Sequence, residues 1–369
     1  MGRLVLRTSG SSGGGGSTPA DGDLYTFTSN VSSTELPDNE FLGGLTGAIE
    51  SGTNNTAFSR SGWTKLSGST VADWYYSNVR SLNRTKSLLY DGTARGESDI
   101  NGGNARGTQQ YDWGASGWQE LYTSTYYYWD YPHMDALTLQ WKVNRWLTND
   151  DAGSGNPQIV DGNDPSAYMS HVTANDNVFL AGFVTGAADW AQYFSPPDDY
   201  SSGPVKMIRN AWFRIETFFK ENSPAGTSNG TFRVKVTEVA NPSNTWSRTY
   251  TNVLFRGSGD HSNPFRYFIY QNYLGNSAFV YGAWEQCKLY MDDHFMSRRT
   301  TTGAQRRVEM IDAATVGAST KVGVIQPLTQ LSGTSRQVRI NKGHWSSVAG
   351  KYLVEYDDTN TVVTTIGPL

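Results

Sequence analysis

Apolar and polar residues alternate along two adjoining stretches in the middle of the chain. Trp212 to Lys220 reads Trp-Phe-Arg-Ile-Glu-Thr-Phe-Phe-Lys, and Thr231 to Val239 reads Thr-Phe-Arg-Val-Lys-Val-Thr-Glu-Val. A period of two is typical of a strand with one buried and one solvated face. Turn residues around Pro224 separate the runs, so they predict a β-hairpin. A helical stripe from Met207 to Phe219 is the alternative interpretation of the first run.

The polar positions of this predicted hairpin are mostly charged. The run Ala136 to Val143 alternates in the same way, with Leu139 and Trp141 on its apolar face. We expect the polar positions of the three runs to line one groove of an antiparallel sandwich and to bind a ligand there. These predicted ligand-binding residues are Gln140, Lys142, Arg214, Glu216, Arg233 and Lys235.

Strand-like runs continue through most of the chain, with Gly, Asn, Asp and Ser turns between them. They predict an all-β fold: a large antiparallel jelly-roll sandwich over residues 23–300. The expected strands are 23–28, 86–90, 120–128, 136–145, 178–183, 212–220, 231–239, 247–254, 265–273 and 283–297. Two long polar stretches, 91–117 and 148–171, are expected to be loops that border a groove or contact a neighbouring subunit.

The two ends of the chain differ from this main body. Residues 1–22 predict an arm, in which a short β segment precedes a Gly/Ser-rich linker at 10–17. Such a segment pairs with its own sheet edge or with another subunit, or it is a frayed terminus. Residues 301–369 predict a small β domain for docking, with short strands at 307–311, 321–325, 336–340, 352–356 and 361–366.

Composition agrees with a β-rich protein and excludes several classes. The chain has 369 residues, with 21 Tyr, 15 Phe, 12 Trp and 39 Gly. With 17% charged residues and a formal net charge of -4, bulk charge predicts no nucleic-acid partner. Cys287 is the single cysteine, so no intrachain disulfide forms. No membrane span or secretory signal is recognisable, so we expect synthesis in the cytoplasm.

Several runs follow the order found in a known family of folds. Leu139 to Trp146, Trp212 to Asn222, the turn Ser228 to Gly230 and Leu289 to Ser297 together resemble the concanavalin A-like jelly rolls. The likeness is to the branch with heparin-lyase-like and alginate-lyase-like enzymes, which also includes carbohydrate-binding and virion-borne domains. It covers about residues 23–300 and concerns strand patterns, so it implies the fold more strongly than an activity.

The resemblance implies candidate catalytic residues for a polysaccharide lyase. The strand Arg266 to Tyr273 resembles the tyrosine-bearing strand of alginate-lyase-like enzymes, which makes Tyr273 the acid/base candidate. Gln140, with Lys142 and Arg214, would bind the substrate carboxylate, and His133 would lie near that face. The family's Arg-rich motif and its Gln-x-His motif do not appear, since Gln140-Trp-Lys142 stands where a Gln and a His are expected. These departures favour a protein that binds polysaccharide without cleaving it.

Asp292 and Asp293 form a second candidate site. In jelly-roll relatives an Asp on the last strand often helps to hold a structural Ca²⁺, which requires about six to eight oxygen ligands. Asp23, Asn30 or Asp38 would complete the shell. The alternative is an ordinary exposed acidic pair.

Three functional hypotheses follow from the sequence. The first is a structural virion protein, such as a phage capsid-decoration or tail-associated component with a glycan-binding jelly roll. It would contact other virion subunits through the N-terminal arm and form a homo-oligomer. The second is a lyase that cleaves uronic-acid polymers by β-elimination. The third is a cellular carbohydrate-binding or adhesion protein with an extracellular location.

Overall fold

The chain folds almost entirely into β-strands. The computed structural model describes residues 18–33, 35–45, 47–65, 74–82, 84–91, 104–114, 116–130, 140–148, 166–171, 178–183, 210–253, 255, 265–275 and 288–369. The helices in these ranges are one turn of α-helix, α1 (Ala48–Ser51), and a 3-10 turn at Val316–Ala318. None of the described helices is long and apolar enough to cross a membrane.

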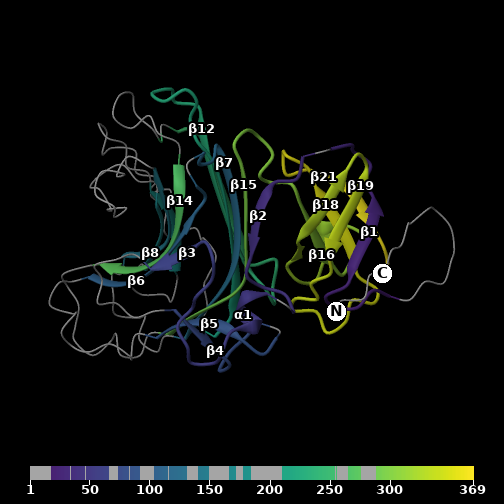
Figure 1. Ribbon diagram of the computed structural model, residues 1–369, viewed down its shortest axis with the longest axis horizontal. Helices are drawn as coiled ribbons and strands as arrows, with labels where there is room; N and C mark the ends of the chain where they lie inside the picture. Colours follow the sequence, from purple (N-terminus) through teal and green to yellow (C-terminus); the bar gives the residue numbers. More distant parts are fainter. Residues whose placement is uncertain are drawn as a thin grey trace.

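Two antiparallel sheets stack to form a sandwich, and a third β unit lies beyond the larger of them (Figure 1). In spatial order, the six-stranded sheet contains β10 (Val178–Phe183), β9 (Ser166–His171), β8 (Gln140–Thr148), β14 (Phe265–Gly275), β6 (Asn104–Asp112) and β3 (Trp63–Lys65). The eight-stranded sheet contains β13 (Thr245–Val253), β12 (Gly230–Glu238), β11 (Trp212–Lys220), β7 (Glu120–Asp130), β15 (Lys288–Arg299), β5 (Ser87–Asp91) and β4 (Tyr75–Ser77), with β2 (Asp38–Phe41) also paired to β15. The predicted all-β antiparallel sandwich is therefore confirmed.

Aromatic side chains fill the space between the two sheets. Phe213, Ile215 and Phe219 of β11 are buried in this core, as their alternation predicts. The Phe219 ring lies 4.8 Å from that of Trp118 and 4.8 Å from that of Phe265, so aromatic contacts join the two sheets. The run at 212–220 is thus a strand, and the helical alternative is wrong.

The third β unit combines the two ends of the described chain. Its sheets are β17 (Val324–Gln326), β16 (Arg307–Ile311), β20 (Tyr352–Tyr356) and β21 (Val362–Ile366), and β1 (Leu24–Thr28), β19 (Ser335–Arg339) and β18 (Leu328–Ser332). We call residues 301–369 with β1 the C-terminal unit. Phe27 of β1 is buried with Val338 of β19 in the core of this unit. The expected first strand of the sandwich therefore belongs to the C-terminal unit instead.

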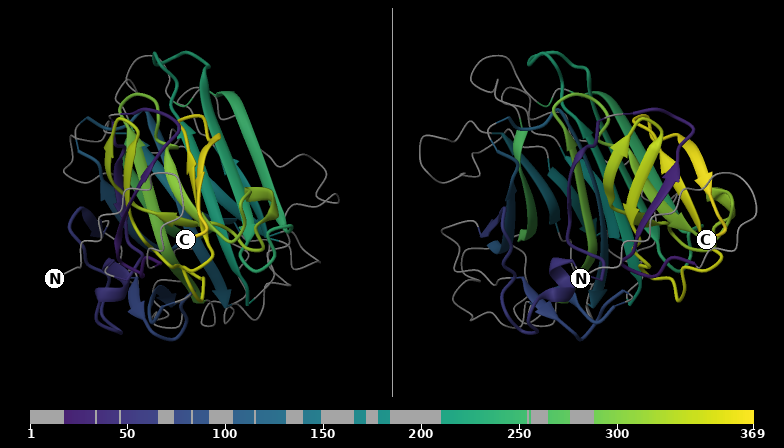
Figure 2. Two further views of the ribbon diagram at one scale, coloured as in Figure 1. Left: turned by 90° about the vertical axis from the view of Figure 1, so that its right-hand side faces the viewer. Right: turned by 45° about the vertical axis from the view of Figure 1, so that its right-hand side comes forward.

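The C-terminal unit lies against the outer face of the eight-stranded sheet (Figure 2). Three layers result: the six-stranded sheet, the eight-stranded sheet and the C-terminal unit. The order explains why the outer face of the middle layer is buried.

Most strands lie where alternation predicts them, but two expected loops contain strands. β6 lies within 91–117, and β9 lies within 148–171. Both are rich in Ser, Asn, Gly, Gln or Ala and poor in β-branched residues, so composition conceals them. Each lies between two other strands of the six-stranded sheet, where pairing with the neighbours rather than local propensity determines the structure.

Candidate functional site

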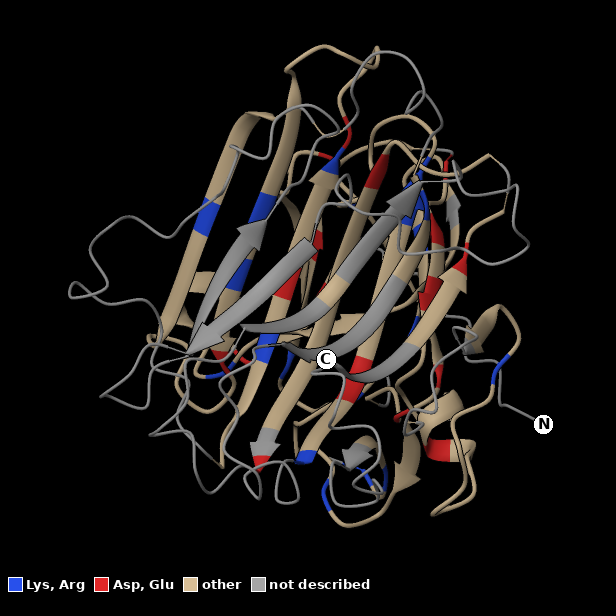
Figure 3. Ribbon diagram, turned by 90° about the vertical axis from the view of Figure 1, so that its left-hand side faces the viewer, with Lys and Arg blue, Asp and Glu red and all other residues tan. Residues whose placement is uncertain are grey.

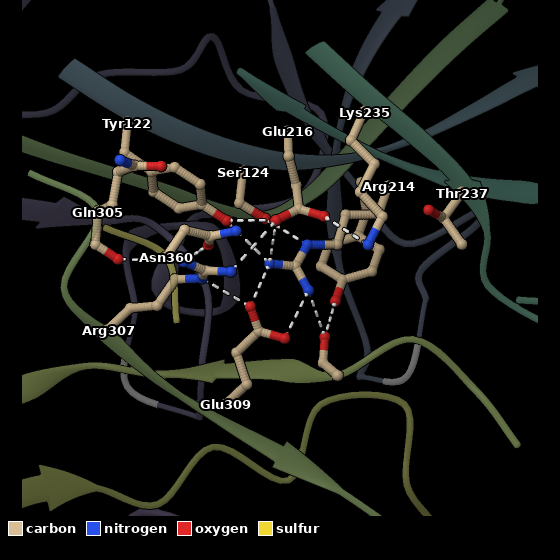
Figure 4. Close-up of polar contacts among 12 residues, drawn as sticks. Tyr122, Ser124, Arg214, Glu216, Lys235, Thr237, Gln305, Arg307, Glu309 and Asn360 are labelled. Atoms are coloured by element: carbon tan, nitrogen blue, oxygen red, sulfur yellow. Dashed lines mark hydrogen bonds and ion pairs between the residues drawn. The ribbon is translucent and has the colours of Figure 1, made fainter. Parts of the chain in front are cut away.

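The outer face of the eight-stranded sheet carries a buried network of charged residues. Arg214 of β11 is 1% exposed, and its guanidinium donates to both carboxylate oxygens of Glu309 on β16, at 3.1 and 2.8 Å. It also donates to Ser124 Oγ at 2.8 Å and to the carbonyl oxygen of Gly323 at 2.8 Å. Arg214 therefore joins the sandwich to the C-terminal unit (Figure 4).

A second arginine and a second glutamate balance the charge of this network. Arg307 donates to Glu309 at 2.7 Å, and its guanidinium lies over the rings of Tyr122 and Tyr356 at 4.7 and 4.0 Å. Glu216 accepts hydrogen bonds from the Tyr122 hydroxyl at 2.6 Å and from Arg214 at 3.1 Å. Two cations and two carboxylates, each with hydrogen bonds, make burial of the charges tolerable.

Electrostatics hold these four groups in their charged forms. Burial alone raises the pKa of Glu309, but Arg214 and Arg307 outweigh it and hold that pKa below its ordinary value. Burial alone would lower the pKa of Arg214. The charges of Glu216 and Glu309 outweigh burial, so the pKa of Arg214 lies well above its ordinary value. Groups held this firmly in one protonation state do not serve as a general acid or base near neutral pH.

The residues of the hairpin therefore do not line the open groove that the sequence predicted. Arg214, Glu216 and Lys235 do share one face, because Glu216 lies opposite Lys235 in the register of β11 and β12. That face is covered rather than open: Arg214 is buried, the Glu216 side chain is 12% exposed, and Arg233 donates to Gln305 of the C-terminal unit. Lys235, with its side chain 47% exposed and 3.9 Å from Glu216, lies at the rim.

The other sequence-predicted residues lie on the opposite sheet. Tyr273 of β14 lies directly opposite Lys142 of β8 on one side and Arg106 of β6 on the other. Lys142 lies opposite Tyr168 of β9. We call Arg106, Tyr273, Lys142 and Tyr168 the cross-strand row. Directly opposed residues share a face, so the row lies on one face of the six-stranded sheet.

The register indicates that this is the outer face. Phe268 of β14 is buried in the core, and β14 pairs with β6 without a break from Tyr267 to Gly275. Alternation from Phe268 therefore gives Tyr273 an outward register position. Figure 3 views the molecule from this side, with the charged strands of the eight-stranded sheet behind. Gln140, two residues from Lys142, shares the outer face.

A register shift in β8 reverses part of the predicted alternation. The shift lies between Lys142 and Asn144 in the pairing with β9. Asn144 is 1% exposed and accepts a hydrogen bond from the hydroxyl of Tyr127, an inward residue of the eight-stranded sheet. A β-bulge of this kind moves later residues to the other face, so Asn144 faces the core although Lys142 has an outward register position.

The cross-strand row includes two residues that the sequence did not reveal. Arg106 and Tyr168 belong to β6 and β9, which were expected to be loops, so their cross-strand neighbours were not predictable. An Arg in a polar run gave no signal by itself. His133 lies outside the described residues. The sequence-predicted set thus divides between two sheets and does not form one site.

Asp292 and Asp293 lie at the junction with the C-terminal unit. Both are 2% exposed, and Asp293 has a φ of +41° at an irregularity of β15. The oxygens of Asp292 accept from the backbone N–H groups of Leu82 at 2.9 Å and Asp293 at 2.8 Å. Asp293 accepts from the N–H of Gly44 at 3.1 Å. Burial, followed by the Asp293 charge, raises the pKa of Asp292 well above its ordinary value.

These contacts do not fit the expected calcium shell. Asp38 pairs with Arg298, Asn30 donates to the Val363 carbonyl oxygen and Asp23 accepts from Ala20, so none of them joins the acidic pair. Within the described ranges, no group of three or more His, Cys, Asp or Glu residues is arranged to hold a metal. Calcium at Asp292 and Asp293 stays a prediction from the sequence.

Comparison with known proteins gives distant structural matches. Neither a family model nor a curated protein sequence matches the chain. An alginate lyase of Aplysia kurodai matches at 13% identity over 61% of this chain and 87% of its own, with a TM-score of 0.43. An alginate lyase of Chlorella virus matches at 11% identity over 61% and 89%, with a TM-score of 0.40.

A third match is the CBM2 module of an evolved Dit protein of Lactobacillus casei BL23 phage J-1. It is 11% identical over 72% of this chain and 98% of its own, with a TM-score of 0.38. Since all three TM-scores are below 0.5, these similarities carry no argument about activity or ligand, which therefore has to come from this chain's own residues.

Proposed function

We propose that this chain is a glycan-binding β-sandwich protein whose binding surface is the outer face of the six-stranded sheet. The observation that carries the proposal is the cross-strand row, which brings Arg106, Tyr273, Lys142 and Tyr168 together from four neighbouring strands. Guanidinium and ammonium groups bind carboxylates, and tyrosine combines an apolar ring with a hydroxyl. Acidic polysaccharides match this combination.

The burial of the other sheet supports the same surface. The outer face of the eight-stranded sheet is occupied by the C-terminal unit, and Arg214 is bound by Glu309 there. A polymer that contacts a sheet face needs one that is free of the protein's own domains. The outer face of the six-stranded sheet lies on the side away from the C-terminal unit (Figure 1).

Binding measurements with a matched pair of lysine variants test the proposal. We expect a screen of neutral and acidic polysaccharides to identify an acidic ligand. Lys142→Met should then weaken binding about 10-fold, because it removes a cation from the row. Lys235→Met is the matched control on the opposite sheet and should bind like the wild type. Equal effects of both variants, or no binding to any acidic polymer, would contradict the proposal.

A uronate lyase is the second candidate, favoured by the register of Tyr273 between two cationic residues. In β-elimination a base removes the C5 proton, the electron pair forms the C4–C5 double bond, and the C4–O bond breaks as the leaving oxygen takes a proton. Arg106 and Lys142 would neutralise the carboxylate that acidifies the C5 proton, and Tyr273 would transfer protons. With His133 outside the described residues, the base is assigned to Tyr273 alone.

Turnover separates this candidate from binding alone. Cleavage of alginate or heparin-like polymers by β-elimination produces an unsaturated uronate that absorbs in the ultraviolet. A lyase should produce this absorbance, and Tyr273→Phe should abolish it while the bound fraction changes little. Binding without any absorbance rise across several uronates would remove the lyase and leave the glycan-binding function.

We further propose that the chain is carried on a virion as a structural component of a phage capsid or tail. The support is the arrangement of the ends: β1 follows the Gly/Ser-rich linker in sequence and belongs to the C-terminal unit, on the far side of the sandwich from the proposed glycan surface. Attachment through the arm at 1–22 would leave that surface free to face a host glycan. A cell-surface adhesion protein is the alternative setting.

Removal of the arm tests this setting. Deletion of Gly2 to Thr8 should abolish incorporation into particles and leave glycan binding unchanged, since the sandwich and the C-terminal unit are intact. The control replaces the same residues by a Gly/Ser sequence of equal length. Incorporation that survives the deletion would contradict attachment through the arm.

A further inference from the structure

Nitrogen atoms without hydrogen-bond partners gather at one place in the C-terminal unit. Both ring nitrogens of His344 and the indole nitrogen of Trp345 are buried, and they have no hydrogen-bond partner in the described part of the chain. The two rings are 4.6 Å apart. Buried polar groups normally have partners because leaving them unpaired is costly, so a ligand that supplied hydrogen-bond partners to these nitrogens would be bound favourably.

Two lysines lie beside the same pair of rings. The ammonium group of Lys351 is 4.6 Å from the centre of the Trp345 indole, and that of Lys321 is 5.6 Å from it. Among the described residues neither lysine forms an ion pair with a carboxylate. Two like charges at one indole repel each other, and an anion between them would relieve that repulsion.

The surroundings of the rings are basic rather than acidic. Lys321, Arg214 and Lys351 add positive potential at His344, and Asp312 is the acidic group that opposes them. Asp312 is already engaged, since it accepts from the Ser319 hydroxyl at 2.7 Å and from the Thr320 N–H at 2.9 Å. Arg214 is paired with Glu309, so Lys321 and Lys351 are the cations of this neighbourhood that have no ion-pair partner among the described residues.

We propose that Lys321, Lys351, His344 and Trp345 form a binding site for a small oxyanion such as sulfate or a carboxylate. The lysines supply charge, and the imidazole and indole N–H groups supply directional donors. The site lies where the C-terminal unit meets the sandwich, because the His344 ring is 6.3 Å from that of Tyr126 on β7. The inference is independent of the glycan surface on the six-stranded sheet.

Titration calorimetry and thermal unfolding with sulfate test the site. Sodium sulfate at millimolar concentration should bind saturably and raise Tm above sodium chloride of equal ionic strength. The variant Lys321→Met/Lys351→Met should bind at least about 10-fold more weakly. Lys342→Met, in the same loop as His344 but without contact to the indole, is the matched control and should bind like the wild type.

A spectroscopic readout keeps the test valid if the double variant fails to fold. In wild-type protein with ¹⁵N-labelled histidine, sulfate should shift the imidazole signals of His344, identified by their loss in His344→Gln. The source of the anion is resolved by comparing sulfate with sulfated and uronate oligosaccharides: tighter binding of an oligosaccharide assigns the site to a glycan, and equal binding assigns it to a free anion. Absence of saturable binding and of any His344 shift would overturn the site.

Discussion

The two outer faces of the sandwich carry similar residues and have opposite roles. On the eight-stranded sheet, Arg214 is buried against the C-terminal unit, and residues of that unit pair with Arg214 and with the partly buried Glu216. On the six-stranded sheet, Arg106, Tyr273 and Lys142 lie at outward register positions with no part of the C-terminal unit on that side. Alternating charge on a strand thus identifies a face that is not core. It does not distinguish a ligand surface from a domain interface.

The largest expected effect is a loss of stability when Arg214 on the buried face is replaced. Arg214→Met leaves Glu309 and Glu216 buried without their main partner, which should lower the free energy of unfolding by about 3–5 kcal/mol. Urea denaturation measures the loss. Arg214→Met/Glu309→Leu should recover part of it, because the pair is then replaced by apolar groups. A loss below about 1 kcal/mol, as for exposed ion pairs, would contradict the interface assigned to this face.

A second contact between the layers should have a smaller effect. Arg84 donates to Asp21 at 2.6 and 3.0 Å and to the side-chain oxygen of Asn341 at 2.6 Å. Arg84→Met should lower stability by about 1–3 kcal/mol, because charge-assisted hydrogen bonds are lost at a half-buried position. Arg80→Met is the control, since the Arg80 side chain is 40% exposed and pairs with Asp130 at 3.4 Å. Equal denaturation midpoints of the two variants would rule out a special role for Arg84.

How far the sequence predicts these faces depends on the range of the interactions. Alternation locates β11 and β12 because burial on one side of a strand leaves a local pattern. It does not reveal that Glu309, 95 residues away from Arg214, covers the other side. The partner of a charged face is set by tertiary contacts, which no local pattern encodes.

The cross-strand row was partly predictable for the same reason. Tyr273 and Lys142 stand out from their own strands, but their alignment requires the register of β14 and β8, which includes an irregularity. Arg106 was missed because β6 has a polar, loop-like composition. The place of β1 was not predictable for a similar reason, because its pairing with β19 joins parts of the chain that are far apart in sequence.

Low pH should decrease the stability of the folded chain through His344, which lies in the C-terminal unit. Burial, followed by the positive charge of Lys321, lowers its pKa from the ordinary 6.5 to about 3. The unfolded chain binds a proton near pH 6.5 and the folded chain does not, so stability should fall as pH decreases from about 6.5 towards 3. His344→Phe should reduce this slope between pH 6.5 and 4 in urea denaturation at fixed salt. An unchanged slope would contradict a buried neutral imidazole.

The smallest expected effect concerns calcium at the acidic pair on the covered face. Three backbone N–H groups already bind the carboxylates of Asp292 and Asp293, and Arg84 supplies positive charge nearby. We therefore expect millimolar calcium or a chelator to leave Tm unchanged, whereas a ligand at 100 times its Kd would add about 2.7 kcal/mol. Magnesium at equal ionic strength is the control. A rise with calcium, lost in Asp293→Asn, would instead support the ion that the sequence predicts, and would make the junction a metal-dependent contact between the layers.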